Sequence, residues 1–284
     1  MSPNLRKRLA VAGVGVPLCA LVTYAGGAVF VTGLGAAAAL GYREFAAMMR
    51  DTGTRVLALP GTVAAFLFPF VVFAGGLEGG GFYAASLMLA FPALALATVD
   101  LSERPIRAAA CTTFGVFYIG GLLALSLPLR EGGLLLPADG DANAGRMAGT
   151  LLFLFPVVIT WLADTAAYVG GRALGKRPLA PRVSPNKTVA GAVCALLAGL
   201  ATAVLYPRFL LPEIWALDLA FTLAFGLVVT GFAVVGDLAE SALKRECGVK
   251  DSSGLLPGHG GVLDRLDSIL WAVPAAFLFL FLFA

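Results

Sequence analysis

The sequence predicts an all-α fold, a polytopic helical bundle integral to a membrane, and three observations support this class. Hydrophobic residues make up 59% of the 284 residues and charged residues only 13%, whereas charged residues make up about 25% of an ordinary soluble domain. The mean hydropathy of the chain is +0.90. Apolar runs recur at roughly the 20-residue length that crosses a bilayer as a helix, and basic residues gather between these runs.

About nine apolar segments are long enough to be membrane-spanning helices. The first follows a basic N-terminus, as in a signal peptide, but no polar cleavage region follows Ala20, so we expect it to remain as the first span. The expected spans are residues 9–25, 27–48, 55–75, 81–99, 106–127, 147–169, 188–210, 214–236 and 268–284.

The basic residues predict the orientation of this bundle. With the N-terminus in the cytoplasm, all twenty Lys and Arg residues except Arg130, Arg146 and Arg208 fall in cytoplasmic segments. Because Lys and Arg resist translocation, this asymmetry agrees with the positive-inside rule. We therefore expect a multi-pass protein of the cell (inner, cytoplasmic) membrane. The net charge of +3 reflects this topology and gives no reason to predict nucleic-acid binding.

Polar residues divide the chain into two functional parts. Residues 1–145 carry few polar residues within their spans, and we predict that they form N-terminal transmembrane helices with a scaffold role. Residues 146–284 are predicted to form C-terminal transmembrane helices with a catalytic site facing the cytoplasm. In that half, charges recur at the membrane edge in 164–172, 184–188 and 237–267.

Asp164 lies inside a predicted span, in the run WLADTAAYVGGR. A carboxylate there costs about 2.5–3.5 kcal/mol unless it faces protein, water or a cation. A functional role is therefore one reading. The other is an acid at a helix end that is satisfied by the basic loop after it.

The segment Ser184-Pro185-Asn186-Lys187-Thr188 predicts a helix start, with Ser184 as the N-cap and Pro185 at the first helical position. Free N–H groups at such an end favour anions, so a lysine there is unfavourable unless a bound phosphate offsets it. The alternative is an ordinary capped helix whose lysine only marks topology.

The acids after the eighth span predict a cation site. Asp237, Glu240, Ser241 and Lys244 share one face if that span continues as a helix, and Asp264 and Asp267 are three residues apart. Oxygen ligands from two helices, with space for substrate phosphate, suit a hard divalent cation. A pair of acids alone would more often be structural, but these acids flank a glycine-rich segment and several bases.

These residues also carry a family resemblance. Lys244-Arg245, Lys250-Asp251 and PGHGGVLDRLD at 257–267, preceded by Ser241, closely resemble the signature of phosphatidate cytidylyltransferases, also called CDP-diacylglycerol synthases. Gly236-Asp237-Leu238, DTAAYVGGR and SPNKT are similar to that family as well. One departure is visible, because Val189 and Ala190 stand where the family usually has an aromatic residue and a Glu.

The resemblance implies transfer of a cytidylyl group from CTP to phosphatidic acid, in a homodimer that works among membrane lipids. One or two Mg²⁺ ions are the expected cofactors, and a monovalent cation is a further candidate. Metal ions and basic residues would bring the anionic substrates together. We assign Asp237, Asp264 and Asp267 to metal and catalysis, with Lys244 and His259 as further catalytic residues. The predicted substrate contacts are Asp164, Tyr168, Arg172, Ser184, Asn186, Lys187, Thr188, Ser241, Arg245, Lys250, Asp251, Gly260, Gly261 and Arg265.

Two other classes of protein share some of these features. A polyprenol or phytol kinase, or a CDP-archaeol synthase, would keep the metal and phosphate residues and change the lipid acceptor. A secondary transporter for an organic anion would also place acids and helix N-termini within the membrane. The full PGHGGVLDRLD match argues against the former group, and charges gathered at one face without a paired repeat argue against the latter.

Overall fold

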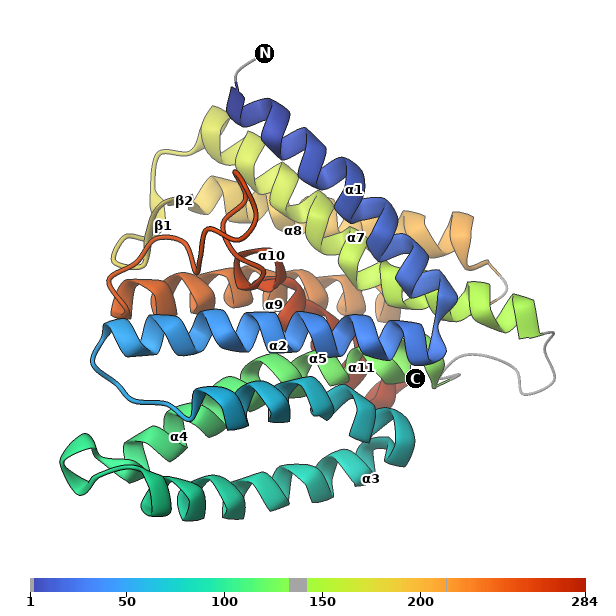
Figure 1. Ribbon diagram of the computed structural model, residues 1–284. Coiled ribbons are helices and arrows are strands. Elements are labelled where there is room, and N and C mark those ends of the chain that lie inside the picture. Colours follow the sequence, from blue (N-terminus) through green and yellow to red (C-terminus); the bar gives the residue numbers. More distant parts are fainter. Residues whose placement is uncertain (1–2, 133–141, 213) are drawn as a thin grey trace. The chain divides into compact units, whose positions relative to one another are not determined.

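The computed structural model describes residues 3–132, 142–212 and 214–284, and it is predominantly helical (Figure 1). This confirms the all-α class. The chain forms two compact units. Unit 1 contains residues 1–127 and 246–265, and unit 2 contains residues 128–245 and 266–284. The predicted functional boundary at residue 145 stays a prediction. The two units are defined by packing and not by function, and unit 1 also includes residues 246–265 from the second half of the chain.

Unit 1 is built mainly from three long apolar helices and shorter elements. Its helices are α1 (Pro3–Ala25), α2 (Gly27–Asp51), α3 (Ala58–Thr98), η1 (Leu101–Glu103), α4 (Pro105–Gly115), η2 (Val116–Gly121) and α5 (Leu122–Ala124), with α6 (Ser126–Glu131) crossing the unit boundary. The late segment 246–265 contributes a loop and most of the short helix α10 (Leu263–Leu266).

The helix α3 turns back on itself at Gly76, as Figure 1 shows. Gly76 has a φ of 61°, which glycine adopts without the steric penalty of a side chain. The hydroxyl of Tyr83 donates to the carbonyl of Ala64 across this bend, at 3.1 Å. One helical element therefore contains the two segments that the sequence predicts at 55–75 and 81–99.

The core of unit 1 is formed by large side chains of α2 that fill spaces left by glycines. The ring of Tyr42 lies where a side chain at Gly61 would be, and Phe45 does the same at Gly115. Both aromatic residues are nearly inaccessible to solvent. These contacts fix the rotation of α2 about its axis, and this rotation determines the direction of Glu44, which lies between Tyr42 and Phe45.

Unit 2 contains helices and one small hairpin. Its elements are α7 (Ala142–Leu174), β1 (Pro178–Ala180), β2 (Ser184–Thr188), α8 (Val189–Leu210), α9 (Leu219–Glu246) and α11 (Ile269–Phe283). The two strands pair antiparallel, with Pro178 opposite Thr188 and Ala180 opposite Ser184. The helix α9 continues to Glu246, which confirms that the eighth predicted span runs on as a helix past its charged residues.

An aromatic cluster holds α7, α8 and α9 together. Phe155 stacks on Tyr206 at 4.7 Å and on Phe225 at 5.0 Å between ring centroids. The indole N–H of Trp215 donates to the hydroxyl of Thr222. The absence of a side chain at Gly199 leaves space for Thr230, so α8 and α9 approach closely. This cluster makes the three helices a firm support for the charged residues at one end of them.

Six helical segments of the described residues are long and apolar enough to cross a membrane. They are 58–98, 105–131, 145–174, 189–210, 219–246 and 263–283. A further apolar stretch, Gly13–Ala25, is shorter. These segments establish a membrane protein with multiple spanning helices, whereas the count of nine and the cytoplasmic N-terminus stay predictions.

Candidate active site

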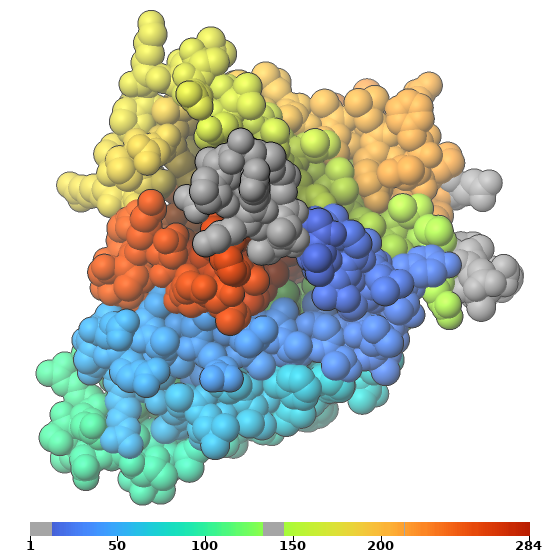
Figure 2. Space-filling view, turned by 45° about the horizontal axis from the view of Figure 1, so that its top comes forward, coloured from blue at the N-terminus to red at the C-terminus, as the bar shows by residue number. Residues whose placement is uncertain are grey.

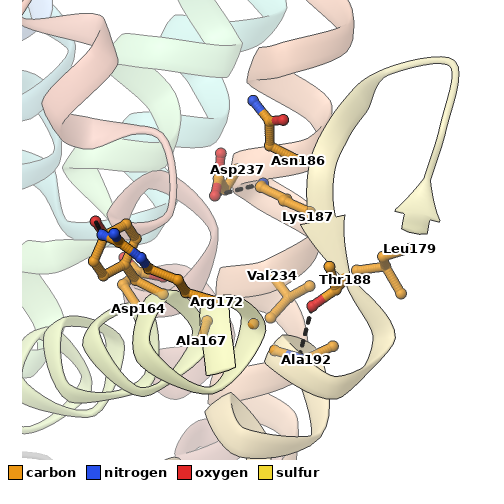
Figure 3. A pocket seen from close by; sticks show the side chains of 13 residues that line it. Asp164, Ala167, Arg172, Leu179, Asn186, Lys187, Thr188, Ala192, Val234 and Asp237 are labelled. Carbon is orange, nitrogen blue, oxygen red and sulfur yellow. Dashed lines mark hydrogen bonds and ion pairs between the residues drawn. The ribbon is translucent and has the colours of Figure 1, made fainter. Parts of the chain in front are cut away.

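A pocket of about 670 Å³ in unit 2 gathers seven of the predicted site residues. Ligand pockets commonly have volumes of about 300–1,000 Å³. The predicted residues that line it come from α7, β2 and α9, and they are Asp164, Tyr168, Arg172, Asn186, Lys187, Thr188 and Asp237. Figure 3 shows side chains from these elements around one space. Three motifs that are far apart in sequence therefore form one site.

The hairpin positions the lysine of the SPNKT segment. Residues 184–188 are extended in β2, and α8 begins only at Val189. The helix is capped by Thr188, whose hydroxyl accepts from the N–H of Gly191 at 3.1 Å. The prediction of Ser184 as N-cap is therefore wrong, because residues 184–188 pair with β1 instead of opening the helix. Ser184 is not among the residues lining the pocket.

Lys187 and Asp237 form an ion pair across the pocket. The Nζ atom of Lys187 lies 2.5 Å from Oδ2 of Asp237, as the dashed line in Figure 3 marks. The two side chains are 26% and 30% exposed. The Nζ atom of Lys187 is itself buried, so the exposed part of that side chain is its stem. A ligand therefore reaches the two charges through the pocket that both residues line. The pair thus presents one cation and one anion to anything that enters the pocket.

The helix α7 supplies a second polar group to the pocket. The guanidinium group of Arg172 donates to the hydroxyl of Tyr168, one turn earlier, at 3.3 Å. Asp164 lies one further turn back and is exposed. These residues share a helix face because they are four positions apart. Asp164 therefore lies beside other polar groups, as the functional reading of its position expects.

Close packing between α7 and α8 brings these side chains to the pocket. A methyl group added at Gly191 would lie 2.8 Å from the carbonyl oxygen of Ala167, which is backbone and cannot rotate away. Both residues line the pocket. The glycine at position 191 therefore sets the distance between the helix that carries Arg172 and the helix that follows Lys187.

Further along α9, a second ion pair is buried. Lys244 Nζ lies 2.5 Å from Oε2 of Glu240, and these side chains are 13% and 0% exposed. Their spacing confirms that they share one helix face. Neither residue lines the 670 Å³ pocket, nor do Ser241 and Arg245. Glu240 thus neutralises one of the lysines that the sequence assigns to catalysis.

The PGHGG segment belongs to unit 1, together with the other predicted residues from 250 to 265. Lys250, Asp251 and Arg265 are exposed there. His259 donates its backbone N–H to the carbonyl of Leu256, and its Nδ1 atom has no hydrogen-bond partner among the described residues. The segment is a turn in which Gly258 and Gly260 have φ values of 78° and 79°, a conformation that favours glycine.

Asp264 is enclosed by the same loop. Asp264 is only 5% exposed to solvent. The Oδ2 atom accepts from the backbone N–H groups of Ser252 and Gly261, at 2.8 and 2.7 Å, and from the hydroxyl of Ser252 at 2.8 Å. The carboxylate therefore organises the loop, whatever else it binds.

Asp267 belongs to unit 2 and lies near the segment of Asp237. Its carbonyl oxygen would be 2.8 Å from a methyl group added at Gly236, the residue before Asp237. Its Oδ1 atom accepts from the N–H of Ser268 at 2.6 Å. Within the described ranges, no group of three or more His, Cys, Asp or Glu side chains is arranged to hold a metal ion. Magnesium commonly takes only one or two carboxylates together with substrate phosphates, and the half-exposed Asp237 fits that smaller requirement.

The sequence analysis did not identify Glu44, a buried acid on α2. Its carboxylate accepts hydrogen bonds from both ends of the PGHGG-containing loop, including the N–H of Leu263 at 2.8 Å. A signal was available, since Glu44 shares the α2 face of Gly41 and Met48, which are both buried. An acid on an apolar helix face needs hydrogen-bond donors, because a buried carboxylate without them is costly.

Comparisons with known proteins extend over nearly the whole chain. A family model described as "Cytidylyltransferase family" matches residues 6–283. The chain belongs to the cytidylyltransferase family. It is 40% identical over 209 residues to a phosphatidate cytidylyltransferase of Brucella suis, covering 73% of this chain and 69% of that protein. It is 31% identical over 304 residues to the chloroplastic phosphatidate cytidylyltransferase 4 of Arabidopsis thaliana, covering 98% of this chain and 73% of that protein.

A more local similarity is stronger. The chain is 44% identical over 127 residues to a phosphatidate cytidylyltransferase of Haemophilus influenzae, and the match spans 44% of each protein. Ala190, which stands where the family usually has a Glu, lies next to the pocket. Ala190 is the second residue of α8 and directly precedes the pocket residues Gly191 and Ala192.

Proposed function

We propose that this chain transfers the cytidylyl group of CTP to phosphatidic acid and forms CDP-diacylglycerol and pyrophosphate. In this reaction an oxygen of the phosphatidate phosphate bonds to the α-phosphorus of CTP. The bond from that phosphorus to the bridging oxygen of the β-phosphate breaks, and pyrophosphate leaves. Family membership and relatives named phosphatidate cytidylyltransferase support this reaction and these two substrates.

The chemistry requires charge neutralisation more than a strong base. The second pKa of a phosphate monoester is about 6, so the attacking phosphate is largely dianionic at neutral pH. The enzyme must therefore bring two anions together and stabilise the charge that develops on the leaving pyrophosphate.

The observation that carries the proposal is the ion pair of Lys187 and Asp237 in the pocket of unit 2. On entry of the triphosphate, Lys187 turns from Asp237 to a phosphate oxygen. Arg172, Tyr168 and Asn186 line the same pocket and supply further donors to phosphate, ribose or base. The pocket is lined by unit 2 residues alone, so the proposal assigns capture of CTP to that unit.

Magnesium is part of the proposal. Once Lys187 has moved, Asp237 has a free carboxylate oxygen, and Asp267 follows on the segment that packs against Gly236. These residues would hold Mg²⁺ bound with the triphosphate, and the ion would neutralise charge on the phosphates. Electron paramagnetic resonance of Mn²⁺ tests this without turnover, because Asp237→Asn should release Mn²⁺ from the protein–CTP complex.

The remaining features are also proposals. We propose that the protein works as a homodimer in the inner membrane, that its pocket faces the cytoplasm, and that a monovalent cation assists it. The distribution of Lys and Arg supports this orientation. Native mass spectrometry tests the dimer, and labelling of a cysteine at exposed Arg182 in sealed vesicles tests the orientation.

Product analysis with purified protein separates the candidate reactions. Labelled CTP, Mg²⁺ and phosphatidic acid should give CDP-diacylglycerol and pyrophosphate in equal amounts. A lipid kinase would instead transfer the γ-phosphoryl group of CTP to the hydroxyl of a polyprenol or phytol and release CDP. A CDP-archaeol synthase would require an ether-linked lipid. An anion transporter would yield no product at all. Absence of CDP-diacylglycerol under these conditions would overturn the proposed function.

A further inference from the structure

The loop that carries the PGHGG segment rests on a helix from the opposite end of the sequence. In Figure 2 the orange-red surface of this loop lies against the blue surface of α2, within unit 1. Glu44 on α2 is 6% exposed, and its carboxylate contacts the loop. A buried carboxylate is costly unless hydrogen-bond donors surround it, so its partners reveal its role.

Each oxygen of Glu44 accepts one backbone N–H and one serine hydroxyl. The Oε1 atom accepts from Val262 N at 2.9 Å and from Ser253 Oγ at 2.6 Å. The Oε2 atom accepts from Leu263 N at 2.8 Å, and it lies 3.1 Å from Ser252 Oγ, whose single hydroxyl hydrogen is shared with Oδ2 of Asp264. The serines precede the PGHGG turn and the two N–H groups follow it, so one side chain joins both ends of the loop.

Asp264 completes the same network. Its Oδ2 atom lies 2.8 Å from Ser252 Oγ, which also reaches Glu44. The same Oδ2 atom accepts from the backbone N–H groups of Gly261 and Ser252, and it thereby connects the end of the turn to Ser252. Two buried acids thus close the loop around a shared serine.

The glycine at position 261 is fitted to this carboxylate. A methyl group added there would lie 2.5 Å from Oε2 of Glu44 and 2.1 Å from Oγ of Ser252. Gly261 therefore serves the network by its lack of a side chain. The sequence of the turn and the acid on α2 are matched to each other, although they are more than two hundred residues apart.

We propose that Glu44 is a positioning residue for cytidylyl transfer, and that it holds the His259-containing turn in its working conformation. This inference rests on the proposed function. Glu44 does not contact a substrate in this role. It acts through Val262, Leu263 and the two serines, and it fixes where His259 and Asp264 lie.

The variant Glu44→Gln tests the proposal with a minimal change of shape. An amide has one acceptor oxygen and one donor NH₂ group. A serine hydroxyl can rotate to accept from that NH₂, but a backbone N–H cannot. Each oxygen of Glu44 faces one backbone N–H, so either orientation of the glutamine opposes the N–H of Val262 or of Leu263. The loop must shift to relieve this contact.

Two measurements follow the shift separately. Hydrogen exchange of the amides of residues 252–264 should accelerate by about tenfold or more, because a buried donor loses its acceptor. The kcat should fall about tenfold to a hundredfold. The KM for CTP should stay within about twofold, since the pocket assigned to CTP is lined only by unit 2 residues. A merely structural role would not separate kcat from KM in this way.

The matched control is Glu78→Gln, which changes an exposed glutamate of α3 in the same unit. It should leave both exchange and kinetics unchanged. A milder variant, Ser253→Ala, removes only the hydroxyl that donates to Oε1. It should lower kcat by about threefold to tenfold and accelerate exchange in the same residues. This variant decides the matter if Glu44→Gln fails to fold.

The outcomes are distinct from failure of the proposed function. If the wild-type protein makes no CDP-diacylglycerol, the proposed function is overturned. Hydrogen exchange of the amides of residues 252–264 then still tests whether Glu44 stabilises the loop. Accelerated exchange with an unchanged kcat shows that the loop moved without affecting turnover, and this overturns the positioning role. Unchanged exchange in Glu44→Gln overturns it as well.

Discussion

Charged residues are satisfied in opposite ways in the pocket of unit 2 and in the loop of unit 1. In the pocket, Lys187 and Asp237 each remain about a quarter to a third exposed and form a single ion pair. In the loop, Glu44 and Asp264 are 6% and 5% exposed and accept several hydrogen bonds each. The first pair can exchange its partner for a ligand. Glu44 and Asp264 cannot release their hydrogen-bond donors to bind a ligand unless the loop unfolds.

This difference shows how a membrane enzyme can divide its acids between chemistry and architecture. Breaking the ion pair of Lys187 and Asp237 costs little when an incoming phosphate replaces the carboxylate as the partner of the buried Nζ atom. Removing the partners of a buried acid leaves it unsatisfied and is expensive. Charge alone therefore does not identify a ligand-binding acid. The exposure of the carboxylate and the number of hydrogen-bond donors around it distinguish such an acid from a structural one.

Replacement of Lys187 should produce the largest effect and tests the pocket side of the comparison. In Lys187→Met a charge-assisted contact to phosphate is lost, which is worth about 1.5–3 kcal/mol, or about tenfold to more than a hundredfold in kcat/KM for CTP. Steady-state kinetics with CTP and phosphatidic acid varied in turn measure it. Lys176→Met is the matched control, since it changes an exposed lysine just beyond α7.

The outcome for CTP also distinguishes the pocket from the loop. Lys187→Met should change kcat/KM for CTP, whereas Glu44→Gln should change mainly kcat. Unchanged kinetics in Lys187→Met would show that the lysine only pairs with Asp237 and marks topology. The proposed contrast between a charge that binds a ligand, as at Lys187, and a charge that only holds a loop, as at Glu44, would then fail.

A smaller effect is expected from Gly191→Ala, which tests how the pocket is shaped. The added methyl group would meet the carbonyl oxygen of Ala167 at 2.8 Å and push α7 from α8. Such overpacking commonly costs about 1–3 kcal/mol. We expect a lower Tm in detergent and a KM for CTP that rises several-fold.

The control for this variant is Gly231→Ala on α9, where an added methyl group has no atom within 4 Å. Alanine is also the better helix former, so this change should leave Tm equal or slightly higher. Equal behaviour of the two variants would mean that close packing at Gly191 does not define the pocket.

Much of this arrangement follows from sequence pattern. The apolar runs locate the helices, although α9 ends at Glu246 and not near residue 236 as the expected span does. This continuation explains why Glu240 and Lys244 pair one turn apart. The charged motifs on α7, β2 and α9 could be assigned to one face of the membrane. Their residues Arg172, Lys187 and Asp237 indeed line one pocket.

The remainder depends on contacts that local pattern does not contain. Ser184-Pro185 suits a helix start and also the first residues of a strand, and only pairing with β1 decides between them. Thr188 then becomes the N-cap. Glu44 was missed for a related reason, since its partners at Ser252 and Leu263 are distant in sequence. A local reading recognises the acid and cannot know its donors.

The smallest effect concerns Cys247, the second residue of the unit 1 segment that ends at Arg265. Its side chain is buried, and burial raises the pKa of its thiol, with the nearby Glu246 and Asp51 carboxylates raising it further. The raised pKa means that the folded protein disfavours the thiolate. The contribution of this group to the free energy of unfolding is therefore fully present below the ordinary thiol pKa. It is lost as the pH rises from that value through the raised pKa of the folded state.

The thiolate is the species that reacts with alkylating agents. In a variant with Cys19, Cys111 and Cys194 replaced by serine, iodoacetamide should modify native Cys247 about tenfold more slowly than the unfolded chain at pH 7.5. The rate should rise toward alkaline pH. Mass spectrometry over time measures both rates. If the native and unfolded rates are equal, the segment opens readily in solution. Asp264 in that segment, and Glu44 on α2 that binds the segment, would then also be open to solvent. The distinction between the two regions would fail.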